Sequence, residues 1–529
     1  MGIAVQSHPT RSAPRFPARL CLVLVSAALY TLAYPPIDQR AAALVAVAPF
    51  LLALRAARVY EAIALAVVWS LATMSVGITE WLVPAVVVYY QQSLLTGIAL
   101  LVGTTLVGAT LEYGAFALCY RRLSERFAPY AIVLLTAAAW AAAELCRTRI
   151  GFGNPWGLFG YALVETGGDP SVWGTMTQIA DLGGVYAVSF VLVAFNAGLA
   201  EIVVAVRGRD TRSAGRMLLT CGAIVAGVLA YGGLRVRDVT ERHVDPVPVS
   251  IIQGNLDLGS QWREEMYGAN LAEYLELTRR AVVESAPRVV FWPENAMTFF
   301  VDREPEYRGI VGATIGRLDV ELVAGAPRFE GDGDYRYFNS VFLLRPDGDI
   351  VARYDKQRLL PFGEYFPFGM IDLLKRSFGR VREMTPGSAS APLPSRAGAL
   401  GSIVCNEAMY PEDAVARVRD GAEVLVNLSH DSYVPGVEFA ENQLRIATLR
   451  AIEQRRSLVR ASTSGPSAIV DPTGRVVTRS VPHTAMVLAG SVLPSRELTL
   501  YARIGDTFAW SCLIVAVVAM LLTRRTAVL

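Results

Sequence analysis

An isolated cysteine stands between an apolar run and two polar residues, in Gly401-Ser402-Ile403-Val404-Cys405-Asn406-Glu407. A thiol at the carboxyl end of a buried strand is a candidate nucleophile. Cys405 is the only cysteine in the polar part of the chain, because the others lie in or beside long apolar stretches: Cys21, Cys119, Cys146, Cys221 and Cys512. It therefore has no partner there for a disulfide and no companions for a zinc site. The competing interpretation is a small buried residue without chemistry, since free cysteine is among the most buried residue types.

A thiol nucleophile needs a base, because a free thiol with a pKa of about 8.5 is only a few per cent ionised at pH 7. Glu294 follows an apolar run in Phe291-Trp292-Pro293-Glu294-Asn295. It lies just past a predicted strand, where the active sites of α/β proteins assemble, and is a candidate general base. An acid favoured by the dipole at a helix N-terminus would give the same pattern.

The turn-rich segment 353–365 places Lys356 before a second carboxylate, Glu364. A lysine can stabilise the negative charge that develops on a carbonyl oxygen during nucleophilic attack, and one such donor is typically worth about 3–4 kcal/mol. Glu364 could orient Lys356 or share the proton transfer. Taken alone, the segment is equally compatible with an ordinary charged loop.

The composition indicates a membrane protein that carries a large polar domain. Of the 529 residues, 53% are hydrophobic, which is too apolar for an ordinary soluble enzyme of this length. The 49 basic and 47 acidic residues give a net charge of +2, so no basic excess favours nucleic acid as a partner.

Eight apolar runs are candidate membrane spans when they are compared with the roughly 20 residues that cross a bilayer. They cover residues 18–34, 41–55, 60–78, 92–119, 130–146, 183–206, 217–234 and 506–523. The second run is the weakest, because it is short and contains Pro49. The stretch from Ile78 to Cys119 is ambiguous, because it has no basic residue over about the length of two spans.

Basic residues set the expected orientation in the membrane. Arginines gather next to alternate ends of the runs, at Arg11, Arg15, Arg19, Arg55, Arg58, Arg121, Arg122, Arg126, Arg207, Arg209, Arg212, Arg216, Arg524 and Arg525. The opposite connections contain only Arg40, Arg147 and Arg149, the last two in the long connection from about 147 to 182. Because basic loops stay in the cytoplasm, both termini should be cytoplasmic and the polar region extracytoplasmic. The first run ends without a small-residue cleavage site and should remain as a span.

The polar region is predicted to form one α/β domain. Short β-rich runs recur at 247–253, 288–292, 320–325, 338–344, 400–405, 423–427 and 466–470, with helical stretches at 262–284 and 439–455. Strands that are almost continuously apolar are typical of a sheet covered by helices. No glycine-rich phosphate loop follows a strand, which argues against a nucleotide enzyme. The expected units are a helical membrane domain, an α/β domain and a final helix with its tail, at 1–244, 245–495 and 496–529.

Three motifs in order resemble the Glu-Lys-Cys triad of the nitrilase superfamily. They are Trp-Pro-Glu ending at Glu294, Tyr-Asp-Lys ending at Lys356 followed by Pro-Phe-Gly-Glu, and Cys-x-Glu starting at Cys405. With seven apolar runs before the polar domain and one behind it, nearly the whole chain resembles the apolipoprotein N-acyltransferases. Further similar motifs are Gln253-Gly254-Asn255, Trp262, Asn339, Asn427-Leu428-Ser429-His430-Asp431 and Gly151-Phe152-Gly153-Asn154-Pro155-Trp156.

The resemblance implies a fold, a reaction and a set of partners. The fold would be an αββα sandwich attached to about eight transmembrane helices. The enzyme would sit in the bacterial cytoplasmic (inner) membrane and complete lipoprotein maturation. It would move an acyl chain from a phospholipid, through a thioester on Cys405, to the α-amino group of the N-terminal diacylglyceryl-cysteine of an apolipoprotein. It would work in the lipid bilayer as a monomer, without metal or organic cofactor.

The resemblance also assigns roles to residues. Glu294, Lys356 and Cys405 would be catalytic. Supporting residues would be Glu364, Asn406 and Glu407. Substrate-binding residues would be Trp156, Trp262, Asn339, Tyr365 and Phe366.

Two positions depart from the family pattern. Asn406 follows the nucleophile where an aromatic residue, often tyrosine, is expected. The pattern Asn-x-Ser-Asn-Asp-x-Trp appears here with His430 and Tyr433. These departures concern the shape of the acyl pocket and leave the triad intact. With only four histidines in the chain, a Cys–His mechanism would need His430.

Other interpretations remain at the level of the sequence. The apolar segment 365–375 could be a lid over the site or an internal core helix. A membrane-tethered amidase acting on a small soluble amide would use the same triad, but it would not need seven preceding spans. A transporter or receptor with an inactive domain would explain the spans, with Glu112 and Glu144 as its intramembrane charges, and would leave the intact triad unexplained.

Overall fold

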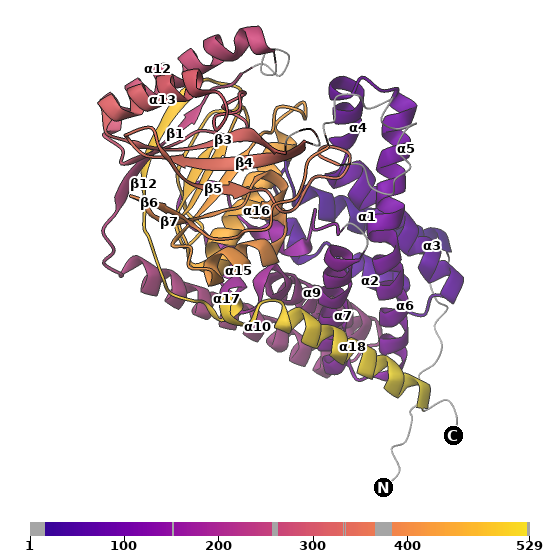
Figure 1. The fold of residues 1–529 in the computed structure, drawn as a ribbon. Coiled ribbons are helices and arrows are strands. Elements are labelled where there is room, and N and C mark those ends of the chain that lie inside the picture. Colours follow the sequence, from indigo (N-terminus) through magenta and orange to yellow (C-terminus); the bar gives the residue numbers. More distant parts are fainter. Residues whose placement is uncertain are drawn as a thin grey trace.

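A computed structural model describes residues 16–150, 153–256, 263–331, 333, 335–365 and 383–525. A bundle of helices comes first in the chain, a pair of β-sheets follows, and two helices complete the described part (Figure 1). The bundle consists of α1 (Phe16–Leu32), α2 (Ala48–Leu54), α3 (Val59–Ser70), α4 (Leu82–Pro84), α5 (Leu94–Thr105), α6 (Leu111–Arg126), α7 (Pro129–Arg149), α8 (Val172–Thr177), α9 (Ala180–Arg207) and α10 (Thr211–Thr240). The final helices are α17 (Leu500–Ile504) and α18 (Thr507–Arg525).

Five helices in the described residues are long and apolar enough to cross a membrane: Val59–Ile78, Leu94–Arg126, Pro129–Arg149, Ala180–Arg207 and Thr211–Thr240. Three shorter apolar helices, Phe16–Leu32, Arg40–Leu54 and Thr507–Thr523, coincide with the other predicted runs. The ambiguous stretch 78–119 contributes one long helix. The part before that helix forms α4 and the short π-helix η3 (Ala85–Tyr89).

A buried acid ties two parts of the bundle together. Glu144 on α7 accepts hydrogen bonds from the Trp140 indole (3.0 Å) and from the backbone N–H of Phe159 (2.7 Å). Trp140 in turn packs edge-on against Trp69, with ring centroids 5.6 Å apart. A polar group inside a membrane bundle must find its partners within the protein. Glu144 therefore has a structural role in holding the connection after α7.

The polar domain contains two six-stranded sheets. The first has the order β12-β1-β2-β3-β4-β5, and the second has the order β11-β10-β9-β8-β7-β6. Strands of the first are β1 (Val247–Gln253), β2 (Val289–Phe291), β3 (Glu321–Glu330), β4 (Arg336–Leu344), β5 (Ile350–Asp355) and β12 (Met486–Val492). Strands of the second are β6 (Leu393–Ser395), β7 (Gly398–Ser402), β8 (Val424–Ser429), β9 (Leu458–Ser462), β10 (Ala468–Val470) and β11 (Val476–Arg479).

The sheets pack face to face and helices cover their outer sides. Successive side chains of a strand point to opposite faces. Val289 and Phe291 accordingly pack between the sheets, whereas Val290 and Trp292 pack against α12 (Tyr267–Ser285) and α13 (Pro305–Leu318). Helices α15 (Pro411–Arg419) and α16 (Glu438–Gln454) cover the second sheet (Figure 1). The predicted αββα sandwich next to a helical membrane region is confirmed.

Strand direction brings the candidate residues to common edges of the two sheets. β2 and β3 are parallel, and β5 runs in the same direction because β4 is antiparallel to both β3 and β5. β7, β8 and β9 are also parallel to one another. The segments that carry Glu294, Lys356 and Cys405 therefore each leave the carboxyl end of a strand, at β2, β5 and β7. The predicted strand 400–405 is shorter than expected, because β7 ends at Ser402 and Cys405 begins the 3-10 turn η7 (Cys405–Met409).

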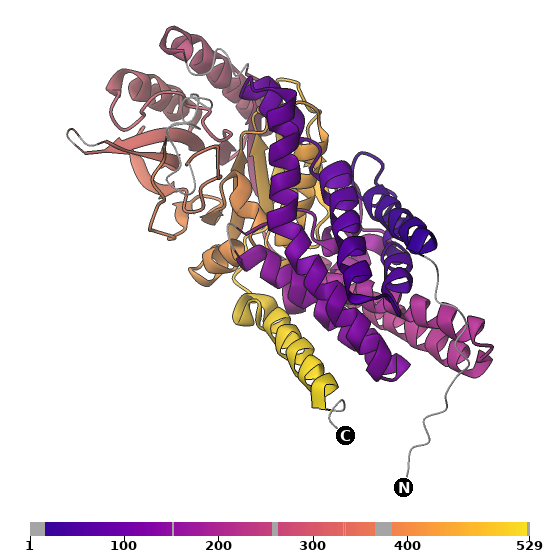
Figure 2. The same cartoon turned by 90° about the vertical axis from the view of Figure 1, so that its right-hand side faces the viewer.

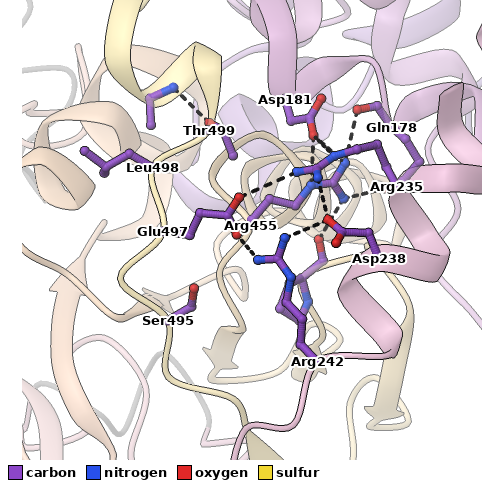
Figure 3. Close-up of polar contacts among 12 residues, drawn as sticks. Gln178, Asp181, Arg235, Asp238, Arg242, Arg455, Ser495, Glu497, Leu498 and Thr499 are labelled. Atoms are coloured by element: carbon purple, nitrogen blue, oxygen red, sulfur yellow. Dashed lines mark hydrogen bonds and ion pairs between the residues drawn. The ribbon is translucent and has the colours of Figure 1, made fainter.

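Figure 2 shows α18 (yellow) lying beside helices of the bundle. Ion pairs fasten the sandwich to the bundle where α16 meets α9 (Figure 3). Arg455, which follows α16 and is 1% exposed, pairs with Asp181 near the start of α9 at 2.9 Å. Arg235 on α10 pairs with the same carboxylate at 2.9 Å. Glu497, in the connection from β12 to α17, pairs with Arg242 in the connection from α10 to β1. The two segments that connect the bundle with the sandwich, 241–246 and 493–499, are thus joined by an ion pair.

Candidate active site

A cavity of about 570 Å³ lies where the ends of the strands meet the membrane region. The side chains of Glu294, Lys356 and Cys405 all line it, together with Asn339 and Glu364. Residues 89 and 90, which follow α4, form part of its wall. The three motifs that are far apart in the sequence therefore share one space.

The nucleophile candidate sits on a tight, buried turn. Cys405 is 3% exposed and has a φ of +48°, a left-handed conformation that costs energy for a residue other than glycine. The amide of Asn427 holds the turn by donating to the carbonyls of Ile403 (2.6 Å) and Cys405 (3.3 Å). Burial raises the pKa of the Cys405 thiol, Glu294 raises it further, and Lys356 opposes both. The thiol is therefore neutral at rest and needs a base when it reacts.

Glu294 presents one bonded oxygen and one open oxygen. Its Oε1 accepts a hydrogen bond from the Asn339 amide at 2.6 Å. Its Oε2 is buried and has no hydrogen-bond partner among the described residues. Burial raises the pKa of Glu294, the Lys356 ammonium lowers it and Glu364 raises it again, for a net increase. A buried carboxylate with an open oxygen in the cavity of a neutral thiol has the properties of a proton acceptor.

A glycine lets the Glu294 segment approach the sheet. A Cβ atom added to Gly325 on β3 would lie 2.6 Å from the Cα of Glu294 and from the backbone nitrogen of Asn295. Such contacts are too short for any side chain, so only glycine permits this packing. The position of the carboxylate thus depends on a residue outside the three motifs.

Lys356 is held between two carboxylates. Its ammonium is 1% exposed and lies 2.8 Å from Oε2 of Glu364 and 3.7 Å from Oε1 of Glu294. Burial lowers the pKa of Lys356, but Glu364 and Glu294 raise it more, and the net pKa is above 10.5. The amide of Asn339 donates to both carboxylates, at 2.6 and 2.7 Å. Lys356 therefore stays charged in a fixed position.

Glu407 links the segment that follows Lys356 to the turn that carries Cys405. One carboxylate oxygen accepts from the Tyr354 hydroxyl (2.8 Å) and from the backbone N–H groups of Gln357 (2.7 Å) and Arg358 (3.0 Å). The other oxygen accepts from the backbone N–H of Val404 at 2.7 Å. The Asn406 amide adds a bond of 3.2 Å to the carbonyl of Arg358. Neither Glu407 nor Asn406 lines the cavity.

The residues expected to bind substrate are distributed differently. Asn339 lines the cavity. Trp156 does not line it; it is 3% exposed, donates from its indole to the carbonyl of Ile78 (2.9 Å) and stacks on Phe439. Tyr365 also lies outside the cavity lining, and its carbonyl accepts a bond from the backbone N–H of Phe362. Trp262, Phe366 and most of the segment 365–375 lie outside the described residues.

His430 lines the cavity but is a weak base. Its ring Nδ1 lies 3.0 Å from the Thr463 hydroxyl. Burial lowers the pKa of His430 to about 4, although Asp431 acts in the opposite direction. The imidazole is therefore neutral at physiological pH and would accept a proton from a thiol poorly.

Sequence reasoning missed several residues around the site. Tyr89 and Tyr90 form part of the cavity wall, and adjacent tyrosines at the edge of an apolar run are the signal that could have found them. Arg460, beneath the cysteine turn, pairs with Asp431 at 2.5 Å and donates to Asn427. The motif 427–431 contains Asp431, but no motif in the sequence points to Arg460.

Comparison with known proteins gives matches along almost the whole chain. The profile described as "Apolipoprotein N-acyltransferase N-terminal domain" matches residues 26–198, and the profile described as "Carbon-nitrogen hydrolase" matches residues 249–495. The apolipoprotein N-acyltransferase of Geobacter metallireducens is 31% identical over 515 residues, which is 96% of each chain. That of Pseudomonas syringae pv. tomato is 29% identical over 520 residues, also 96% of each chain.

Among solved structures, Nit3 of Saccharomyces cerevisiae, a member of branch 10 of the nitrilase superfamily, is similar over 50% of this chain and 94% of its own. The identity is 17% and the TM-score is 0.37. The profiles and the full-length relatives decide the family. The chain is a multi-pass membrane enzyme that belongs to the apolipoprotein N-acyltransferase family, with a domain of the carbon-nitrogen hydrolase type.

Proposed function

We propose that the protein transfers an acyl chain from a phospholipid to the α-amino group of the N-terminal diacylglyceryl-cysteine of apolipoproteins. The observation that carries the proposal is the meeting of Cys405, Glu294 and Lys356 in one cavity of about 570 Å³, part of whose wall is formed by Tyr89 and Tyr90 of the helical region. The names of the relatives supply the class of acceptor.

In the first half-reaction, the sulfur of Cys405 attacks the ester carbonyl of the phospholipid while Glu294 takes the thiol proton. Negative charge develops on the carbonyl oxygen and is stabilised by the Lys356 ammonium and by the backbone N–H of Asn406. The carbon–oxygen ester bond breaks, and the proton held by Glu294 passes to the leaving alkoxide. The products are a lysophospholipid and a thioester on Cys405.

In the second half-reaction, the free amine of the apolipoprotein attacks the thioester carbonyl. Glu294 takes a proton from the attacking nitrogen, the carbon–sulfur bond breaks, and Glu294 returns the proton to Cys405. The acyl chain leaves as an amide. Glu364 supports this cycle by fixing Lys356 at 2.8 Å, and Glu407 supports it by joining the segments that carry Lys356 and Cys405.

The same proposal includes the cellular setting. The protein would work as a monomer in the bacterial inner membrane, with the domain 245–495 on the extracytoplasmic side and both termini in the cytoplasm. The domain 1–244 and the terminal segment 496–529 would hold it in the bilayer. The alternation of arginine clusters along the helical region supports this orientation.

Intact mass spectrometry of the full-length protein tests the chemistry. The wild type, Cys405→Ala and Cys119→Ala are each incubated with phospholipid vesicles in the absence of acceptor. Cys119 lies on α6, away from the cavity lining, and serves as the matched control cysteine. We expect an added acyl mass on the wild type and on Cys119→Ala but not on Cys405→Ala. Addition of a diacylated lipopeptide with a free amine should remove this mass.

An adduct that persists on Cys405→Ala would contradict the assignment of the nucleophile. A folded wild type that forms no adduct but hydrolyses small amides would replace the acyltransferase with a membrane-tethered amidase. An adduct that reacts with water as fast as with the lipopeptide would leave the first half-reaction intact and refute the proposed acceptor.

A further inference from the structure

We propose that Tyr90 and Arg149, two residues of the membrane region, are positioning residues for the catalytic loop, defined here as residues 356–364. This inference rests on the proposed function, because it takes Lys356 and Glu364 of this loop as parts of the reaction machinery. It assigns the membrane region a task beyond anchoring the enzyme and receiving lipid.

The end of the catalytic loop is a tight turn around a strained residue. The backbone N–H groups of Gly363 and Glu364 both donate to the carbonyl of Leu360, at 3.1 and 2.9 Å. Phe362 within this turn has a φ of +62°, which a residue other than glycine keeps only when its surroundings hold it. The Glu364 carboxylate accepts from the backbone N–H of Leu360 at 2.8 Å and thereby takes its orientation from the turn.

Tyr90 holds this turn from the membrane side. It follows η3 in the connection between α4 and α5, and its hydroxyl donates to the carbonyl of Phe362 at 3.1 Å. Phe362 lies two residues before Glu364, whose carboxylate contacts the Lys356 ammonium at 2.8 Å. A displacement of the Phe362 carbonyl would therefore change the position of the charge that fixes Lys356.

Arg149 reaches the other part of the loop through a chain of ion pairs. It lies at the carboxyl end of α7 and pairs with Glu412 on α15 at 2.8 Å and with Asp506 just before α18. Glu412 also pairs with Arg358 at 3.1 Å, two residues after Lys356. The guanidinium of Arg358 lies 3.8 Å from the ring centroid of Tyr410, which limits its freedom further.

The helical region thus acts on the loop at two points on either side of its midpoint. Arg149 acts on Arg358 through Glu412, and Tyr90 contacts Phe362 directly. Lys356 and Glu364 are each two residues from one of these contacts. A displacement of about 1 Å in a catalytic group can slow a reaction by about 100-fold. The packing of the membrane helices should therefore set the reaction geometry, even for a substrate that does not touch the membrane.

Acylation by a water-soluble ester separates positioning from lipid binding. Full-length protein in detergent micelles is mixed with p-nitrophenyl acetate, and nitrophenol release in the first turnover reports acylation of Cys405. The variants are Tyr90→Phe, Arg149→Gln and the double variant. Tyr231→Phe is the matched control, because it removes a tyrosine hydroxyl that binds Asp181 between α10 and α9, far along the chain from the loop.

We expect Tyr90→Phe and Arg149→Gln each to lower the first-turnover rate constant by about 10- to 100-fold, with the KM for the ester changed less than about twofold. Arg149→Lys should recover little of the rate, because an ammonium cannot bridge Glu412 and Asp506 as a planar guanidinium does. The pH at which the rate constant falls on the acidic side should shift in Tyr90→Phe, since the contact of Glu364 with the Lys356–Glu294 pair would change. Tyr231→Phe should react at the wild-type rate.

Wild-type rates for both single variants with the soluble ester would overturn the proposal, and a loss seen only with phospholipid vesicles would reassign both residues to lipid binding. An increase confined to KM would overturn it as well. Tyr90→Phe deletes a single oxygen atom, so its folding should be preserved and its rate is decisive even if Arg149→Gln unfolds. A wild type whose release of nitrophenol is unchanged by Cys405→Ala would instead refute the nucleophile assignment on which the proposed function depends.

Discussion

Two clusters of buried charge in this protein use the same kinds of side chain in different ways. At the domain junction, one oxygen of Asp181 accepts from Arg235 and Arg455 (Figure 3). The other oxygen accepts from the Tyr231 hydroxyl. In the cavity, one oxygen of Glu294 accepts from Asn339 and lies 3.7 Å from the Lys356 ammonium. The second oxygen of Glu294 has no partner among the described residues.

The difference shows what separates a structural ion cluster from a chemical one. Burial is similar, because Asp181 is 2% exposed and Glu294 is 4% exposed. The junction carboxylate is saturated by donors, so its charge can only fix positions. The Glu294 carboxylate keeps one acceptor atom without a partner among the described residues, and Glu294 lines the same cavity as the Cys405 thiol and the Lys356 ammonium. An acceptor atom without a partner, in a residue that lines a cavity, is therefore a better sign of a catalytic role than burial or charge alone.

The largest effect on the acylation rate should come from replacing the Glu294 carboxylate, whose free oxygen is the proposed base. Glu294→Gln keeps the size of the side chain and a carbonyl oxygen for Asn339 but removes the base, so acylation of Cys405 should slow by about 10²- to 10⁴-fold. Thermal stability should change little, and single-turnover acylation measures the rate. Glu276→Gln on the exposed face of α12 is the control and should react like the wild type. Near-normal acylation by Glu294→Gln would assign the base to another residue.

A substitution in the saturated cluster around Asp181 should lower the stability of the protein. Asp181→Asn leaves the buried Arg455 without its charge partner and should destabilise the protein by about 3–5 kcal/mol. Thermal unfolding in detergent measures this loss, and the acylation rate per folded molecule should be unchanged. Glu241→Gln breaks only an exposed pair with Arg237 and should leave the unfolding temperature almost as it was. A slower reaction in a stable Asp181→Asn protein would erase the distinction between the two clusters.

Glu407 sharpens the comparison, because it is saturated like Asp181 but adjoins the site. Glu407→Gln loses charge-assisted bonds worth about 1.5–3 kcal/mol each to the segments carrying Lys356 and Cys405. We expect both lower thermal stability and an acylation rate reduced by about 10- to 100-fold. The two measurements should fall together. A change in stability with an unchanged rate would make Glu407 purely structural.

The smallest effect should come from His430. Acylation should slow as the pH falls through the pKa of Glu294, because the protonated acid cannot accept the thiol proton, and burial places this pKa above 4.5. His430 is already neutral over this range, since its pKa is lowered to about 4. His430→Asn should therefore keep the acidic limb and change the rate less than about threefold. Loss of the acidic limb in this variant would favour a Cys–His mechanism.

Much of the fold followed from local patterns. Apolar runs of sufficient length predicted the helical region, and short apolar strands with helices between them predicted the sandwich. Strands β9, β11 and β12 were missed. So were β5 and β6, because β5 mixes charged and apolar residues and β6 has only three residues. Their pairing with β4 and β7 comes from neighbours in the sheet rather than from their own composition.

The sequence by itself determined which residues could react, because Glu294, Lys356 and Cys405 carry the chemistry in their own side chains and stand in short motifs that occur in a fixed order. Only the tertiary structure decided how they are held. Asn339 joins Glu294 and Glu364, Glu407 joins the lysine loop to the cysteine turn, and Tyr90 reaches Phe362 from another region of the chain. These contacts link segments distant in sequence, and a linear pattern records composition and spacing but not which distant groups meet.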